Sequence, residues 1–148
     1  MWSAETVFVC ALALLGHTKR GFPAVEFVEK APPGVSAQAE AYVLNSEKRM
    51  VLITSTWAFR QAREAEFECG RIEALQEIAG VLAHEEWHLR HGTDEQGAYD
   101  AQLTALLAAG ADQNGALFHN VMRAKQKVMN AAKRRVETGT FAGRDEHN

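Results

Sequence analysis

The segment His84-Glu85-Glu86-Trp87-His88 carries the residue types best suited to metal chemistry in this chain. In a helix, residues four apart lie on the same face with Cβ atoms about 6 Å apart, so two imidazoles can point at one ion. Histidine nitrogen binds zinc at about 2.0 to 2.1 Å. Glu85 lies beside the histidines, where its carboxylate can reach a water on the metal without being a ligand itself. The spacing therefore predicts a zinc site with an open position and a general base, as metal-assisted hydrolysis requires.

A zinc site of this kind needs a third protein ligand, and three residues after the motif are candidates. Glu95 is favoured because it follows the turn at Gly92, and a helical hairpin could fold it back onto the histidine face. His91 lies on the same helix face, but it is seven residues, or about 10 Å along the axis, from His84. Asp94 is the remaining alternative.

The pattern His84-Glu85-x-x-His88 followed by Glu95-x-x-Ala98 resembles the gluzincin metallopeptidases, in which a second helix supplies a glutamate ligand in an E-x-x-(small residue) pattern. It is also similar to compact HExxH peptidases of bacteria and phages. The resemblance implies a zincin-like fold and one zinc ion per chain, bound by His84, His88 and Glu95. It further implies hydrolysis of peptide bonds in a peptide or protein substrate, with Glu85 as general base.

The resemblance suggests roles for neighbouring residues as well. An oxyanion beside the zinc needs a hydrogen-bond donor, for which Tyr99 and His91 are candidates. Asp100 could orient a ligand histidine through its second ring nitrogen. The strand predicted from Arg49 to Thr56 could be a free sheet edge that pairs with an extended substrate. Trp87 is interpreted as a packing residue.

Besides a zinc hydrolase that acts on a non-peptide bond, two other functions are weighed against the peptidase. One is a non-catalytic zincin-like module, in which the zinc is structural or the domain regulates or binds a partner; Glu85 argues against it, because a structural site needs no base. The other is nucleic-acid binding by the C-terminal stretch, where Val121 to Val136 has no acidic residue. Its basic residues are Arg123, Lys125, Lys127, Lys133, Arg134 and Arg135. A net charge of -3, a pI near 6.1 and the lack of interleaved aromatic residues indicate a solvated helix face, so no nucleic-acid partner is expected.

The elements that would position these residues predict one α+β domain over residues 1–148, with a small antiparallel sheet beside a mainly helical body. The expected strands are Pro23–Val28, Ala39–Leu44 and Arg49–Thr56, and the expected helices cover residues 1–16, Trp57–Phe67, Arg71–His91, Asp94–Ala109 and Asn114–Val136. Residues 45–48 are predicted to form a hairpin turn between the second and third strands. The polar tail 137–148 is expected to be flexible.

The N-terminus and the cysteines bear on location. The apolar run from Val7 to Leu15 is nine residues long, too short for a bilayer span of about 20 residues. No basic residue precedes it, as one would in a signal peptide, so it is interpreted as a buried first helix. Cys10 and Cys69 form no CxxC pair and are expected to be reduced, buried thiols. These features predict a cytoplasmic protein without a membrane partner.

Overall fold

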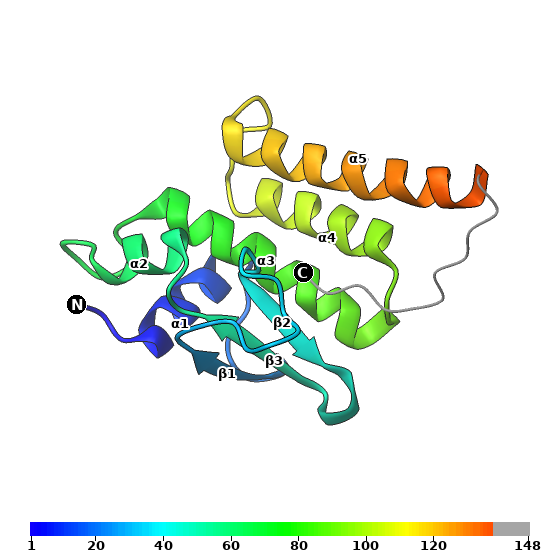
Figure 1. Ribbon diagram of the computed structural model, residues 1–148. Helices are drawn as coiled ribbons and strands as arrows, with labels where there is room; N and C mark the ends of the chain where they lie inside the picture. Colours follow the sequence, from blue (N-terminus) through cyan, green and yellow to red (C-terminus); the bar gives the residue numbers. More distant parts are fainter. Residues whose placement is uncertain (138–148) are drawn as a thin grey trace.

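The computed structural model describes residues 1–137, which form five α-helices and a three-stranded sheet (Figure 1). The elements are α1 (Ala4–Leu14), β1 (Ala24–Val28), β2 (Ala41–Leu44), a 3₁₀ turn η1 (Asn45–Glu47), β3 (Arg49–Ile53), α2 (Trp57–Arg63), α3 (Ile72–His91), α4 (Glu95–Ala108) and α5 (Ala116–Glu137). The predicted α+β class is confirmed. The predicted flexible tail lies outside the described residues, apart from Glu137.

The sheet has the order β1-β3-β2, with β3 parallel to β1 and antiparallel to β2. The prediction of a purely antiparallel sheet is therefore wrong for β1. The prediction that Arg49 to Thr56 forms a free edge is also wrong, because β3 is paired on both sides. Its continuous apolar run from Met50 to Ile53 is buried throughout, as is typical of a central strand covered on both faces.

The free edge beside α3 belongs to β2 instead. Ile53 donates its backbone N–H to the carbonyl of Glu40 at 3.0 Å, which fixes the register of the antiparallel pair. Since hydrogen-bonded and outward-facing positions alternate along such a pair, the backbone groups of Ala41 and Val43 face away from β3. The predicted hairpin turn is confirmed, and it ends at Lys48, which has a φ of 51° and whose ammonium group donates to the carbonyl of Leu89 at 3.3 Å. The hairpin is thereby tied to the last turn of α3.

Helix α3 lies at the centre of the molecule, between the sheet with α1 and α2 on one side and α4 on the other (Figure 1). An apolar stripe on α3, which includes Leu75, Ala79 and Leu82, is buried against the core formed with α1 and the sheet. On its other side, Gly80 lets α4 approach closely: a Cβ atom there would lie 3.0 Å from the side chain of Leu106. This close contact fixes the distance between the two helices that carry the candidate site.

Helix α5 lies beside α4, on the side of α3 opposite the sheet (Figure 1). Its first half packs on α4 through Phe118 and Val121, which form a small second core with Leu106. An ion pair between Lys125 and Asp100 at 2.5 Å joins the middle of α5 to α4. The helix is therefore held mainly by α4, and its second half extends past this contact.

Cys10 and Cys69 form a disulfide bond, with Cα atoms 5.5 Å apart, so the prediction of two reduced thiols is wrong. The two cysteines have a sequence separation of 59, and no local pattern indicated their contact, which arises because α1 packs on α2 and α3. Disulfides persist mainly in oxidising compartments, so this bond does not support the predicted cytoplasmic location. None of the helices in residues 1–137 has the length and apolar character needed to cross a membrane.

Candidate metal centre

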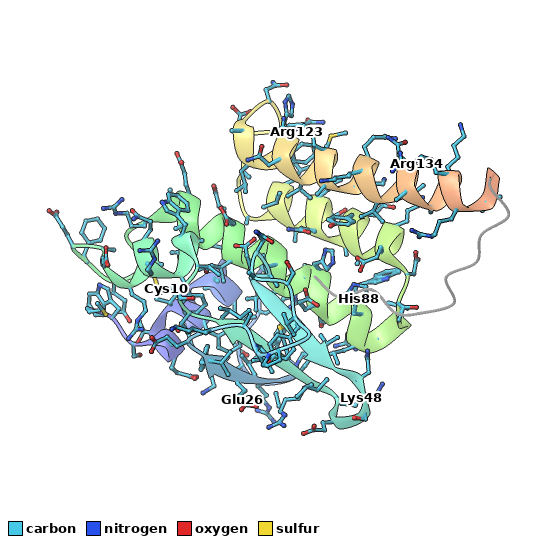
Figure 2. All side chains as sticks on the ribbon, viewed as in Figure 1. Cys10, Glu26, Lys48, His88, Arg123 and Arg134 are labelled. Carbon is cyan, nitrogen blue, oxygen red and sulfur yellow. A yellow bond between two sulfur atoms is a disulfide. The ribbon has the colours of Figure 1, made fainter. Side chains whose placement is uncertain are left out.

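His84 and His88 on α3 and Glu95 in the first turn of α4 meet in the structure. The Nε2 atoms of His84 and His88 lie 3.2 and 3.3 Å from the same carboxylate oxygen, Oε1 of Glu95. One potential ligand atom from each residue lies within 4.8 Å of the other two. Gly92, with a φ of 85°, reverses the chain between the two helices and so returns Glu95 to the histidine face. The side chains are 4%, 5% and 10% exposed for His84, His88 and Glu95, respectively, so the group is almost entirely shielded from solvent. Figure 2 labels His88 near the end of α3.

The outer nitrogen of each histidine has a hydrogen-bond partner that fixes the ring. Nδ1 of His84 lies 2.8 Å from Oε1 of the buried Gln102, and Nδ1 of His88 lies 2.7 Å from the carbonyl oxygen of Gly92. Both partners are oxygen acceptors, so each Nδ1 carries a hydrogen and each neutral ring has its lone pair on Nε2. Nε2 of His84 is buried and faces the carboxylate of Glu95 at 3.2 Å. Two nitrogen lone pairs and a carboxylate oxygen therefore converge, and a cation, either a proton or a metal ion, is needed between them.

The pKa shifts of Glu95 and His88 agree with the need for a cation between these side chains. Burial alone would raise the pKa of Glu95, but hydrogen bonds and charge from His84 and His88 outweigh it and lower the pKa to about 2. Burial would lower the pKa of His88, but the hydrogen bond to Glu95, the carbonyl of Gly92 and the charges of Glu95 and Glu85 raise it to about 8. Without a metal, the cation at the centre is thus a proton on His88, held by an ionised Glu95.

Glu85 and Tyr99 lie beside the group, along a cleft of about 810 Å³ that also reaches His84 and Glu95. Glu85 is only 2% exposed. The ring of Tyr99 meets that of His84 edge-on, with centroids 4.7 Å apart. Burial, with the charges of Glu95 and Glu85, raises the pKa of Tyr99, so its phenol keeps the proton and remains a hydrogen-bond donor. The cleft therefore holds a carboxyl group and a hydroxyl donor next to the candidate metal-binding group.

The structure does not bring His91 and Asp94 to the group. The exposed ring of His91 stacks on Trp87, with centroids 3.9 Å apart, outside the residues that line the cleft. Asp94 is the N-cap of α4, and its carboxylate faces Gly97. Trp87 packs between His91 and Gly97, in agreement with its predicted packing role.

The prediction that Asp100 orients a ligand histidine is wrong. Its carboxylate pairs with Lys125 on α5, and the acceptors for the two histidines are Gln102 and the carbonyl of Gly92. Gln102 lies seven residues after Glu95, on the same face of α4. That spacing is the sequence signal that could have identified it.

A pair of carboxyl groups, Glu40 before β2 and Glu77 on α3, also lines the cleft. Burial, followed by a hydrogen bond to Glu77 and the charges of Glu77 and Glu85, raises the pKa of Glu40 well above its ordinary value. Glu77 precedes His84 by seven residues and so shares its helix face. The floor of the cleft is consequently rich in acidic groups.

Comparisons with protein-family models, with curated proteins and with solved structures gave no match to this chain. Any functional assignment therefore depends on the geometry of the site and the chemistry of its side chains. The strongest part of that geometry is the group of His84, His88 and Glu95.

Proposed function

We propose that the chain is a zinc-dependent peptidase that binds one zinc ion through His84, His88 and Glu95. The observation that carries the proposal is the convergence of two Nε2 lone pairs and the Glu95 carboxylate at one buried point beside a cleft. Two imidazoles and one carboxylate form a typical catalytic zinc set, since three protein ligands leave a position for water. The hydrogen bonds on each Nδ1 support the same conclusion, because ligand histidines almost always donate their second N–H to such an acceptor.

A bound zinc ion would supply a water of lowered pKa and would polarise a substrate carbonyl. With the metal bound, Glu85, next to His84 in sequence and buried beside the cleft, would be the group that takes up a proton and passes it to the leaving amine. Tyr99, which keeps its proton, donates a hydrogen bond to the carbonyl oxygen as negative charge develops there. Gln102 keeps the His84 ring in the tautomer that presents Nε2.

The free edge of β2 supports a peptide as the substrate. Ala39, Glu40 and Ala41 line the cleft, and the backbone groups of Ala41 face away from β3. An extended peptide can add to such an edge as a further strand, with its backbone hydrogen-bonded to the protein. The strand edge available to a substrate is therefore that of β2 rather than that of β3.

The proposal is tested by metal content and by two matched variants. Purified chain, dialysed against metal-free buffer, is expected to retain one zinc ion by elemental mass spectrometry. Glu85→Gln is expected to keep the zinc and to lose hydrolysis of a quenched-fluorescent peptide library by about a hundredfold or more. Glu86→Gln is the control, because that neighbouring carboxylate pairs with Arg90 outside the cleft lining. A chain that takes up no zinc would overturn the proposal, and full activity of Glu85→Gln would exclude Glu85 as the base.

Removing the metal separates the enzyme from the non-catalytic alternative. The apolar core of α1, the sheet and α3 is packed without involving Glu95, so the metal-free chain is expected to remain folded. Domains in which zinc is purely structural commonly unfold without it. Loss of the helical circular-dichroism signal on chelation would therefore favour a structural zinc.

A further inference from the structure

The wall of the cleft opposite the β2 side comes from α5. Ala124, Val128 and Ala131 give this wall an apolar surface, and Lys127 and Arg135 add positive charge. Residues 36–41 form the other wall, and the candidate metal group lies between the two. Figure 2 shows this part of α5, which runs toward the labelled Arg134, above the region of His88. A peptide bound in the cleft would thus lie between the β2 edge and α5.

Charge divides the cleft into two surfaces. Four glutamates line the cleft outside α5. The raised pKa of Glu40 keeps its side chain neutral and Glu95 is a metal ligand in the proposed enzyme, so Glu77 and Glu85 are the acidic groups that would oppose a substrate carboxylate there. Within residues 1–137, the only lysine or arginine side chains that line the cleft belong to α5. Apart from the metal ion of the proposed enzyme, the positive charge that a substrate carboxylate would meet in the cleft therefore comes from α5.

Lys127 is the residue best placed to meet such a group. It is exposed, lines the cleft, and enters no ion pair with the other described residues. Lys125, two residues earlier, is held by Asp100 outside the cleft lining. Lys127 and Arg135 are eight residues apart, about 12 Å along the helix axis, which is close to the length of four extended residues. Both cations can therefore face one bound peptide.

We propose that the α5 wall selects peptides that carry a carboxylate, with Lys127 as the main specificity-determining residue and Arg135 as a second contact. The inference rests on the proposed function, since it names the substrate class of the same cleft. The carboxylate could be an Asp or Glu side chain or the C-terminus of the peptide.

The first experiment distinguishes these sources. A neutral peptide that the enzyme cleaves is prepared with one Glu moved residue by residue along it, and each Glu peptide is compared with its Gln counterpart. The same parent peptide is prepared with a free and with an amidated C-terminus. We expect kcat/KM to rise about five- to tenfold when Glu replaces Gln at one position, or when the C-terminus is free rather than amidated. An increase of this size lies between the effect of a solvent-exposed ion pair and that of a desolvated one.

Variants of α5 then identify the residue responsible. Lys127→Ala is expected to abolish most of the preference through KM, with kcat little changed, and Lys127→Glu to reverse it. Lys133→Ala is the matched control, since Lys133 is an exposed lysine of the same helix that does not line the cleft. The inference is overturned if no acidic peptide is preferred, or if the preference survives in the Lys127→Ala/Arg135→Ala double variant.

A binding measurement keeps this inference separate from the proposed function. Fluorescence anisotropy of labelled Glu and Gln peptides is measured on zinc-loaded Glu85→Gln protein, for which turnover is not required. Absence of hydrolysis of every peptide would reject the peptidase, whereas equal affinity for the Glu and Gln peptides would reject the α5 specificity.

Discussion

Gln102 offers a sharp test of how the candidate site is organised. Its side chain is 8% exposed, and its amide oxygen accepts the hydrogen on Nδ1 of His84 at 2.8 Å. In Gln102→Leu, that buried N–H would lose its acceptor, at a cost of about 1 to 3 kcal/mol. The ring can avoid the cost by moving the hydrogen to Nε2, but Nε2 then no longer binds a metal. Either response weakens zinc binding.

The expected loss of zinc affinity in Gln102→Leu follows from the position of the hydrogen bond behind His84. Loss of a hydrogen bond behind a ligand histidine typically lowers metal affinity about ten- to hundredfold, or by about 1.4 to 2.7 kcal/mol. Zinc affinity is measured by competition with a chromophoric chelator at fixed pH. Gln102→Glu retains an acceptor oxygen and is expected to keep the affinity near that of the wild type.

Gln76→Leu is the matched control for a general effect of losing a buried glutamine. Gln76 is 9% exposed and donates to the carbonyl of Ala109 at 3.2 Å, at the far end of α4 from Glu95. This variant should lower the thermal unfolding temperature of the metal-free protein and leave zinc affinity unchanged. If Gln102→Leu also bound zinc like the wild type, the assigned tautomer of His84 and its role as a ligand would be refuted.

Three further predictions concern other parts of the structure. The pKa of His88 is raised to about 8, and zinc must displace the proton of this residue in order to bind. The apparent zinc affinity should therefore fall about tenfold for each pH unit below 8. Chelator competition across pH 6 to 9 measures this dependence, and an affinity that does not change with pH would contradict it. Reduction of the Cys10–Cys69 bond, with its sequence separation of 59 residues, should lower the free energy of unfolding in urea by up to about 4 kcal/mol. The Cys10→Ser/Cys69→Ser variant should match the reduced protein and be insensitive to reductant. A Cβ atom at Gly97 would clash with the ring of Trp87, so Gly97→Ala should lower the free energy of unfolding by about 1 to 3 kcal/mol and shift the indole fluorescence. A variant with wild-type stability and emission would show that Gly97 and Trp87 do not pack as described.

The helices could be predicted because their signals are local. Ser3 accepts the backbone N–H of Thr6 at the start of α1, and Gly92 ends α3 at the predicted turn. Each signal acts within one turn of helix, so the sequence contains it in full. The extent of α2 was overestimated: it ends at Arg63, and the chain then turns back toward Cys69.

Contacts between distant segments could not be predicted in this way. Nothing in the sequence of β1 specifies that it pairs with β3 in parallel, and the approach of Cys10 to Cys69 depends on how α1 packs. The buried run in β3 did contain a usable signal, because four consecutive apolar residues are typical of a central strand rather than of an edge.

The contrast between local signals and contacts of distant segments also applies to the candidate site. His84 and His88 were grouped from their spacing, and Glu95 was favoured over His91 and Asp94 and supported by the gluzincin resemblance. One helix and one short turn are enough to bring the three together. Gln102 was missed because a polar residue on a helix is usually solvated, and only the packing of α3 on α4 buries it. The pairing of Glu40 with Glu77 depends on the position of the segment before β2 against α3, which no local pattern specifies.

The placement of the three candidate ligands within residues 84–95 also bears on the order of folding. The α3–α4 hairpin is joined by a short turn, so its contacts have low contact order and should form early. The parallel pairing of β1 with β3 joins Ala24 to Arg49 and must close a longer loop first. The segment before β2, which forms one wall of the cleft, belongs to this slower part. We therefore expect a folding chain to acquire the capacity to bind zinc before it acquires the cleft that would bind a peptide.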